Sequence, residues 1–428
     1  MSVPYEVQGL GITELAEEFG TPLYLYDGEE ITTRFAGLRE AVHPSLEFFY
    51  SLKANPNIAI CALLHDSGAR AEVSSLTELV TARRAGVQPK DVIFLGPGKS
   101  RYEVEACLDE DIYSIVCESV EELGLIDELA RERGVVAPVS LRVNPSFQVK
   151  GSGLTMGGKP RQFGTDEELL RAEGSGLAGR YPNIRLMGIQ VYLGTRILSE
   201  ESVVENTRRI FGLAEELSAE LGFPLEMVDV GGGLGIAYFD NEKDLDLAVL
   251  AEGINPLIED FSTRHPDTRL IMELGRFLVA ASGTYVTRVR YTKTSMGENF
   301  AVADGGTNHH MAAVGIGSYV KRNFPMVALE RLDEPATEAW NITGPLCTPN
   351  DLIGKKVPMP PLRPGDLVGV QRSGAYGPTA SPVHFLSHGY PAEVLVLDGK
   401  AHLIRERDDV EAMLGRQRLH RPAAEGSN

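Results

Sequence analysis

The sequence predicts an α/β fold: an N-terminal barrel of eight β-α units, followed by a mostly-β domain. From about residue 45 to 275, short apolar runs alternate with longer amphipathic stretches. There are eight such runs, and eight β-α units in about 230 residues is the size of a TIM barrel. After residue 280 the long helical patterns disappear, and short apolar runs separated by Gly and Pro follow.

The apolar runs that we expect to form the barrel strands are rich in β-branched and aromatic residues. They are Leu46–Leu52, Ala69–Val73, Asp91–Leu95, Ile112–Val116, Val139–Val143, Arg185–Leu193, Met227–Val230 and Arg269–Glu273. Between them, Val120–Glu132 and Glu201–Leu221 have apolar residues at spacings of three and four, which predicts helices. An open, doubly wound sheet has the same alternation, so counting strands favours the barrel without excluding that alternative.

The predicted β domain contains five strands after the barrel, and a helix and a strand before it. The five strands are Thr284–Tyr291, Phe300–Ala303, Ala339–Ile342, Leu367–Val370 and Glu393–Leu397, and the preceding elements are Ile12–Phe19 and Pro22–Tyr26. We therefore expect a barrel at residues 28–280 and a β domain built from residues 1–27 and 281–420. Residues 421–428 have no apolar anchor, which predicts a disordered tail.

Composition excludes several classes of function. The 41 Lys and Arg residues against 60 Asp and Glu residues give a net charge of −19, which argues against nucleic acid or an anionic membrane as partner. No apolar run approaches the roughly 20 residues that span a bilayer, and residues 1–12 lack a signal-peptide pattern. The four cysteines stand far apart without a CxxC pair, which argues against a disulfide framework or a zinc site. We therefore expect an enzyme with reduced thiols in the cytoplasm.

Barrel enzymes place their chemistry at the carboxyl ends of the strands, and Lys53 follows the first predicted strand there. A lysine in this place either extends to solvent or is held for use. Because burial readily lowers its pKa, a lysine held there can carry a carbonyl cofactor as a Schiff base. Lys53 is therefore the first candidate for covalent catalysis.

The seventh and eighth strands end in residues that suit a phosphate group. Gly231–Gly233 expose backbone N–H groups, although the run does not fit the GxGxxG dinucleotide pattern. Glu273, Gly275 and Arg276 follow the eighth strand and supply a carboxylate, a permissive turn and a guanidinium. Loops after strands seven and eight commonly bind phosphate in barrels, so we expect these residues to form one site.

Other polar residues near strand ends or in Gly-rich loops are weaker candidates. Arg142 follows the fifth strand, and Tyr192 and Thr195 follow the sixth. Cys347 and Tyr376 lie in Gly-rich loops of the β domain, where a lone cysteine is more often a small buried hydrophobe. The adjacent histidines 309 and 310 point apart on a strand and lack any ligand spacing, so no metal is expected.

These residues belong to an ordered series of motifs: YSLKANPN, LRVNP, QFG, VDVGGGLG, ELGR, GPLC, SGAYG and PAEVLV. From about Pro22 to Ile404 the chain resembles the fold-type III pyridoxal-phosphate decarboxylases, which include diaminopimelate, ornithine and arginine decarboxylases. The resemblance implies pyridoxal 5'-phosphate as cofactor and a barrel joined to a β domain.

The resemblance also assigns roles position by position. It makes Lys53 the Schiff-base lysine and pairs Glu273 with the pyridine nitrogen. Arg142 would support Glu273 and order the cofactor pocket. Cys347 would return a proton to the substrate carbon from the neighbouring subunit, which implies a homodimer. The remaining residues expected around the cofactor and its phosphate are Tyr192, Thr195, Gly231, Gly232, Gly233, Gly275, Arg276 and Tyr376.

Departures from the family pattern bear on the substrate. Tyr192 stands where the family usually stacks a histidine on the cofactor ring, and Leu274 replaces a proline. Thr348 replaces the acidic residue that binds the distal amino group of the substrate in relatives. Ala312 and Ala313 replace an Arg-Pro pair whose arginine binds the distal carboxylate. Unpaired charges cost several kcal/mol when desolvated. We therefore expect poor binding of a free diamino acid.

The segments Leu154–Gly164 and Asp304–Ala313 are similar to decarboxylases that act on amino acids tethered as thioesters to acyl-carrier proteins in antibiotic pathways. This is the function that we expect, with the basic clusters Lys159–Arg161 and Lys321–Arg322 as carrier contacts. The alternative is a free-substrate diaminopimelate-type decarboxylase. A catalytically dead regulator-binding homologue and a racemase fit the retained motifs less well.

Overall fold

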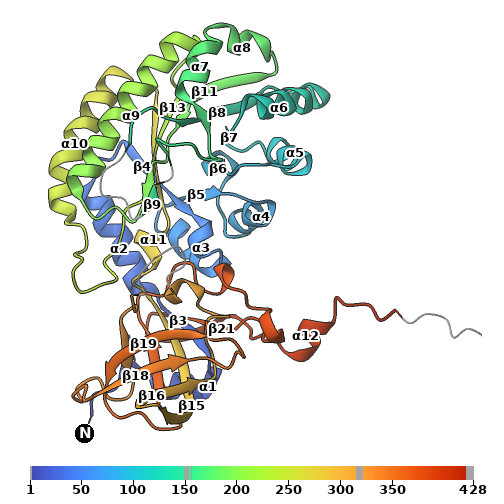
Figure 1. Ribbon diagram of the computed structural model, residues 1–428. Helices are drawn as coiled ribbons and strands as arrows, with labels where there is room; N and C mark the ends of the chain where they lie inside the picture. The colour runs from blue at the N-terminus through green and yellow to red at the C-terminus, as the bar shows by residue number, and fades with distance from the viewer. Residues whose placement is uncertain (1, 149–153, 156, 315–321, 421–428) are drawn as a thin grey trace, which may run out of the picture. The chain divides into compact units, whose positions relative to one another are not determined.

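The computed structural model describes residues 2–148, 154–155, 157–314 and 322–420 (Figure 1). The tail expected at 421–428 and the basic residue Lys321 lie outside the described residues. The chain forms two compact units. One, the barrel unit, contains Tyr26–Thr284 and Gln371–Tyr376, and the other, the β unit, contains Met1–Leu25, Tyr285–Val370 and Gly377–Asn428. None of the described helices is long and apolar enough to cross a membrane.

The barrel unit is built on eight parallel strands. They are β4 (Leu46–Ser51), β5 (Arg70–Val73), β6 (Val92–Phe94), β7 (Ser114–Cys117), β8 (Ala137–Asn144), β11 (Ile184–Gln190), β13 (Met227–Gly232) and β14 (Arg269–Leu274). Each strand pairs with the next, and β14 pairs with β4, so the sheet closes. The barrel prediction is confirmed, and the open doubly wound alternative is wrong because a closed sheet has no edge strands.

Helices follow the strands and lie outside the barrel (Figure 1). They are α2 (Gly28–Ala41), α3 (Ile58–Asp66), α4 (Leu76–Arg84), α5 (Arg101–Glu110), α6 (Val120–Arg133), α7 (Glu167–Glu173), α8 (Gly176–Arg180), α9 (Glu200–Leu221), α10 (Leu247–Arg264) and α11 (Arg276–Val279). Serine N-caps fix the starts of several: Ser75, Ser119 and Ser199 each accept a backbone N–H, and Ser100 forms a capping box with Glu103. These caps hold the loops at the carboxyl ends of the strands in place.

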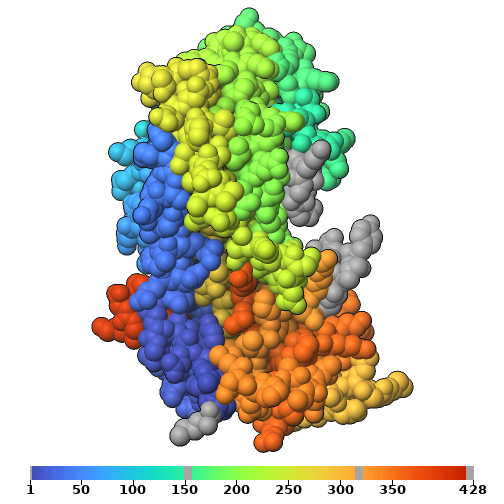
Figure 2. Space-filling model, turned by 90° about the vertical axis from the view of Figure 1, so that its left-hand side faces the viewer, coloured from blue at the N-terminus to red at the C-terminus, as the bar shows by residue number. Residues whose placement is uncertain are grey.

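Helices α9 and α10 pack side by side on the outside of the barrel (Figure 2). Their contact includes stacked rings of Phe211 and Phe261, whose centroids lie 4.3 Å apart. Helix α9 buries one apolar face of leucine, isoleucine and phenylalanine side chains and exposes its charged residues, as its spacing of three and four predicts.

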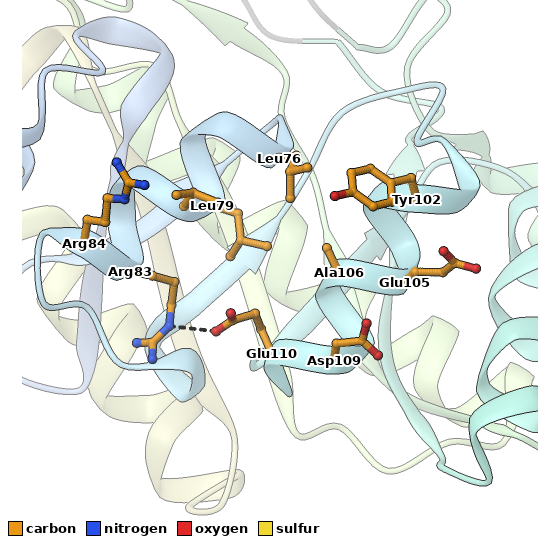
Figure 3. Close-up of a pocket in the computed structure, with 10 residues that line it drawn as sticks. Leu76, Leu79, Arg83, Arg84, Tyr102, Glu105, Ala106, Asp109 and Glu110 are labelled. Carbon is orange, nitrogen blue, oxygen red and sulfur yellow. Dashed lines mark hydrogen bonds and ion pairs between the residues drawn. The ribbon is translucent and has the colours of Figure 1, made fainter.

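A second surface feature is a groove of about 450 Å³ between α4 and α5 (Figure 3). Leu76, Leu79 and Tyr102 form its apolar part. Arg83 and Glu110 form an ion pair of 2.9 Å across it. Charges of both signs line this groove, and it contains none of the strand-end residues.

The β unit contains a nine-stranded sheet in which most neighbours run antiparallel. Its strands are β3 (Leu23–Asp27), β15 (Gly283–Ser295), β16 (Glu298–Ala303), β17 (Met326–Ala328), β18 (Glu338–Thr343), β19 (Leu352–Met359), β20 (Leu367–Val370), β21 (Ala392–Leu397) and β22 (Lys400–Arg405). The five strands predicted after the barrel are confirmed, whereas β17, β19 and β22 were not predicted. Helix α1 (Ile12–Phe19) packs its apolar face on this sheet against Leu25, Val286 and Val394.

Short elements complete the chain. They are the strands β1 (Glu6–Val7), β2 (Leu10–Gly11), β9 (Leu154–Thr155), β10 (Thr165–Asp166) and β12 (Gly194–Thr195), the helix α12 (Val410–Leu414) and the 3-10 turn η1 (Leu52–Ala54). Two of them shape the mouth of the barrel. β9 pairs with β12, and β10 pairs with β8, so the long segment after β8 returns to the carboxyl end of the sheet.

Candidate active site

A cavity of about 450 Å³ opens at the carboxyl ends of the barrel strands. All of its lining residues belong to the barrel unit. They are Lys53, Ser74, Leu95, Gly96, Pro97, Arg142, Phe163, Tyr192, Thr195, Glu273, Arg276 and Tyr376. The cavity therefore brings together seven side chains that the sequence singled out, from positions as far apart as 53 and 376.

Lys53 reaches the cavity from η1, the turn directly after β4. Its Nζ lies 2.8 Å from Oε2 of Glu72, which is fully buried on β5. Ser74 donates a hydrogen bond of 2.9 Å to the other oxygen of Glu72. Burial lowers the pKa of Lys53, but Glu72 and then Glu273 outweigh it and hold that pKa above its ordinary value. Lys53 is therefore held as an ammonium beside a buried carboxylate.

Glu273, at the end of β14, points a nearly buried carboxylate into the cavity. Its Oε1 accepts a hydrogen bond of 2.8 Å from Nε2 of Gln190. Its Oε2 is buried and has no N–H or hydroxyl donor among the described residues. Burial raises the pKa of Glu273, and the nearby charge of Glu72 raises it further. A buried oxygen of this kind suits a cationic N–H donor from a bound group.

Arg142 and Phe163 form another wall of the cavity. Arg142 makes an ion pair of 2.5 Å with Glu118, and its guanidinium lies 4.7 Å from the centre of the Phe163 ring. The other oxygen of Glu118 accepts the backbone N–H of Gly164 at 2.8 Å. Arg142 thus pairs with Glu118 and anchors the returning segment, and it acts on Glu273 through its charge alone.

Arg276 supplies the cationic end of the cavity. Its Nη1 donates a hydrogen bond of 2.9 Å to the hydroxyl of Tyr238, and its guanidinium lies 4.6 Å from the centre of the Tyr376 ring. Its Nε is buried without an acceptor among the residues that the structure describes. Thr195 and Tyr192, whose hydroxyls are hydrogen-bonded to each other, line the same cavity. This end is suited to an anion that accepts several hydrogen bonds.

The glycines at the end of β13 and directly after it are required by close backbone contacts. A Cβ on Gly232 would lie 1.6 Å from the carbonyl oxygen of Glu273, and one on Gly233 would lie 2.0 Å from that of Gly194. The N–H of Gly231 donates to Oδ1 of Asp229 at 2.8 Å, so this amide is already paired within the protein. Gly275 meets the turn η1 in the same way, since a Cβ there would lie 2.8 Å from that of Ala54.

These features fit pyridoxal phosphate. Lys53 offers an amine for its carbonyl group, and the carboxylate of Glu273, whose Oε2 has no N–H or hydroxyl donor among the described residues, offers an acceptor for a protonated ring nitrogen. Arg276 and Thr195 offer donors for its phosphate. Gln190, Glu72 and Tyr238 complete the arrangement as partners of these residues.

Cys347 lies in the β unit, in the loop between β18 and β19, and its side chain is exposed. Asp351, which is buried, fixes this loop: its Oδ2 accepts the N–H of Leu346 at 2.8 Å, and its Oδ1 accepts that of Thr307 at 2.7 Å. His309 in the same unit is buried, with Nε2 3.0 Å from the carbonyl oxygen of Gly389.

Sequence reasoning missed the polar residues that pair with the predicted ones: Glu72, Glu118, Gln190, Asp229 and Tyr238. A charged or amide side chain within a strand is normally assigned to a solvent-facing position. One signal was available for three of them, Glu72, Glu118 and Gln190, because each stands in the last residues of a barrel strand or directly after it.

Comparison with known proteins agrees with this geometry. A family model described as "Pyridoxal-dependent decarboxylase, pyridoxal binding domain" matches residues 28–280. The chain is 41% identical over 408 residues to L-glutamyl-[BtrI acyl-carrier protein] decarboxylase from Niallia circulans, covering 94% of this chain and 95% of the relative. It is 33% identical over 407 residues to diaminopimelate decarboxylase from Neisseria meningitidis serogroup B, covering 94% of each. The crystal structure of Helicobacter pylori diaminopimelate decarboxylase complexed with L-lysine superposes with a TM-score of 0.84 at 29% identity, over 94% of this chain and 98% of that one.

Proposed function

Because the chain belongs to the family of pyridoxal-dependent decarboxylases, we propose that it decarboxylates an amino acid bound as a thioester to an acyl-carrier protein, in a secondary-metabolite (antibiotic) pathway. The observation that most supports this proposal is the 41% identity, over nearly the whole chain, to a decarboxylase whose name specifies a carrier-bound glutamyl group. The diaminopimelate decarboxylases that match over a similar length are 30–33% identical.

The uncharged residues at two substrate-reading positions support a tethered substrate. Thr348 and Ala312 carry no charge at the positions where the resemblance places residues that bind the substrate's distal amino group and distal carboxylate. A thioester removes one charge from the substrate and transfers part of the binding to the carrier surface. The desolvation cost of an unpaired distal carboxylate then disappears.

The returning segment after β8 offers a contact for the carrier. Lys159 and Arg161 are exposed on it, and neither side chain forms an ion pair within the part of the chain that the structure describes. The segment is anchored next to them, since Asn144 donates to the carbonyl oxygen of Lys159 at 3.1 Å and Phe163 lines the cavity. A positive loop at the cavity mouth favours an acidic partner despite the net charge of −19.

Within this proposal, Lys53 would hold the carbonyl carbon of the cofactor, Glu273 its ring nitrogen, and Arg276 with Thr195 and Tyr376 its phosphate. When bound, pyridoxal phosphate accepts the electron pair that the departing CO2 leaves behind. Glu72 orients the amine of Lys53 and must give up its ion pair before that amine is neutral. Burial raises the pKa of Tyr192 to about 12, so this side chain stays an uncharged hydroxyl at neutral pH.

The proton that replaces the lost carboxylate would come from Cys347, supplied by a second copy of the chain in a homodimer. The exposed position of Cys347 on a loop fixed by Asp351 is compatible with a residue that serves a neighbouring subunit. We also propose 28–280 as the cofactor-binding domain and, since all four cysteines are free thiols, a cytoplasmic location.

The direct test supplies purified protein and pyridoxal phosphate with candidate amino acids, each free and as the thioester of a carrier protein. Mass spectrometry then detects the loss of CO2 from each substrate. We expect decarboxylation of a carrier-bound aminoacyl group, with much higher kcat/KM than for the free acid. Efficient turnover of free meso-diaminopimelate without any gain from the carrier would overturn the proposal and establish the free-substrate alternative.

A further inference from the structure

Three neighbouring strands of the barrel bring Gln190, Asp229 and Glu273 together beneath the cavity. Gln190 ends β11, Asp229 lies on β13, and the two residues are direct partners in the parallel ladder. Glu273 lies on β14, the next strand. Gln190 and Asp229 are completely inaccessible to solvent, and Glu273 is 2% exposed. Only Glu273 among the three lines the cavity.

The two carboxyl groups in this cluster are hydrogen-bonded to each other. Oδ1 of Asp229 accepts the N–H of Gly231 at 2.8 Å, whereas Oδ2 of Asp229 and Oε2 of Glu273 have no N–H donor among the described residues. A hydrogen bond between two carboxyl groups requires a proton on one of them. Burial and then the charge of Glu273 raise the pKa of Asp229 well above its ordinary value, which places this proton on Asp229.

Glu273 thus has two donors: the amide of Gln190, which donates to Oε1, and the acid proton of Asp229. Without such donors, a buried carboxylate close to the charge of Glu72 takes up a proton itself. A protonated Glu273 cannot hold a second proton at a ring nitrogen. The hydrogen bonds from these donors therefore favour the ionised form of Glu273, whereas burial and the charge of Glu72 favour its protonated form.

We propose that Asp229 is a neutral carboxylic acid and a positioning residue, which together with Gln190 orients the carboxylate of Glu273 and keeps it ionised for the ring nitrogen of the cofactor. This inference rests on the role proposed above for Glu273. Asp229 itself does not touch the cofactor. Its contribution passes entirely through the carboxyl group of Glu273.

The experiment uses the holoenzyme loaded with pyridoxal phosphate carrying 15N in the ring, whose NMR signal distinguishes a protonated from an unprotonated nitrogen. Asp229→Ala removes the donor, and Asp229→Asn replaces it with an amide that donates to Glu273 and accepts from Gly231. Glu273→Gln, alone and combined with Asp229→Ala, completes a double-mutant cycle. Gln190→Met removes the other donor and provides a second variant if Asp229→Ala does not fold.

We expect the ring-nitrogen signal of Asp229→Ala to move toward the unprotonated value, with kcat about 10- to 100-fold lower and KM little changed, as for a lost hydrogen bond to a charged group. Gln190→Met should move the signal in the same direction. Asp229→Asn should restore the signal, because a neutral donor is all that the position requires. In the Glu273→Gln background, Asp229→Ala should add nothing.

Three results would overturn the inference: an unchanged signal in Asp229→Ala, an Asp229→Asn variant as impaired as Asp229→Ala, or an effect of Asp229→Ala that persists when Glu273 is already glutamine. Failure of the underlying assignment is distinguishable. If Glu273→Gln alone leaves the ring-nitrogen signal unchanged, then Glu273 does not hold the ring nitrogen. If Glu273→Gln moves the signal and Asp229→Ala does not, only the role of Asp229 is wrong.

Discussion

The amine of Lys53 lies 2.8 Å from a carboxylate oxygen of Glu72, a residue that is completely inaccessible to solvent. Ser74 holds the second oxygen of that carboxylate. A fully buried glutamate keeps its charge only where a cation and hydrogen bonds compensate for lost hydration, and Lys53 supplies the cation. The pairing fixes the lysine but also holds it in its unreactive, protonated form.

Glu72→Gln should therefore lower the pKa of Lys53, because burial continues to lower it while only the weaker influences of Glu273, Tyr376 and Tyr192 still raise it. Since the neutral amine is the reactive form, attachment of pyridoxal phosphate to the apoprotein should have its pH midpoint at a lower pH. The visible absorbance after mixing, followed from pH 6 to 10, measures this. Ser74→Ala, which leaves the ion pair intact, is the control, and a midpoint at equal or higher pH would contradict the argument.

Lys53→Ala should abolish covalent attachment of the cofactor. Borohydride reduction of the wild-type holoenzyme should leave a pyridoxyl group on the peptide that contains Lys53, and none in the variant. Lys99 provides an internal control: it is also buried, but its Nζ is held by the carbonyl oxygens of Gly96 and Val116, at 2.8 and 2.6 Å, and by Glu122 at 3.0 Å. A pyridoxyl group mapped to Lys99 would show that the assignment of Lys53 is wrong.

Cys347→Ala should bind the cofactor normally and lose turnover or its fidelity. Cys347 lies outside the cavity-lining set, and delivery of a proton by a positioned acid contributes about 10²–10⁴-fold to a rate. Cofactor absorbance and product formation, measured on the same preparation, separate the two effects. Equal turnover in the variant would reduce Cys347 to a surface residue of the β unit.

Arg161→Glu should raise KM for a carrier-bound substrate while leaving a small soluble thioester of the same amino acid unaffected. The effect should shrink as salt is added, because exposed charges are screened over about 10 Å at 0.1 M. Lys90→Glu is the matched control: Lys90 is also exposed, but it precedes β6 and so lies at the opposite end of the barrel strands. An equal change in both variants would attribute the effect to net charge rather than to a contact.

Glu78→Gln should stabilise the protein at alkaline pH. Glu78 accepts the N–H of Ser74 at 2.8 Å, and burial, the leading cause, raises its pKa from 4.5 to about 7. Between these values the folded state binds a proton that the unfolded state does not, so the stability that Glu78 contributes is present below about pH 4.5 and is lost as pH rises through about 7. Glutamine keeps the acceptor and removes the titration.

Denaturation of wild type and Glu78→Gln at pH 5 and pH 8.5 checks this. We expect the variant to gain about 2–3 kcal/mol relative to wild type between the lower and the higher pH. Glu201→Gln, which alters an exposed glutamate at the start of α9, should show no such dependence. The same stability difference at both pH values would mean that Glu78 titrates at its ordinary pKa.

The barrel strands could be predicted because their burial on both faces leaves dense apolar runs with few alternatives. The edge strands of the β unit could not. β19 and β22 lie at the two ends of their sheet. Their sequences, LIGKKVPM and KAHLIR, both include charged residues, and that of β19 also includes Gly and Pro. An edge strand needs only one partner and one apolar face, so its sequence carries a weaker signal.

The candidate site shows the same division. Lys53 and Arg276 were found because each stands at a strand end beside a recognisable motif. The partner Glu72 could not be assigned, since its contact with Lys53 joins β5 to the turn η1 that follows β4, and so depends on the register between β4 and β5. Alternation within one strand predicts which residues share a face, but not which residue on the next strand meets them.

The short segment Gln371–Tyr376 belongs to the barrel unit although the stretch directly before it, Tyr285–Val370, belongs to the β unit. It is tied there by two hydrogen bonds: the N–H of Tyr376 donates to the carbonyl oxygen of Ala54 at 2.7 Å, and Asn55 donates to that of Gly374 at 3.1 Å. During synthesis, Lys53 and Arg276 therefore leave the ribosome long before the ring that packs on Arg276 exists. A nascent or truncated chain that ends before residue 371 has an incomplete cofactor cavity. The cofactor can therefore find its complete site only after nearly the whole polypeptide has been made.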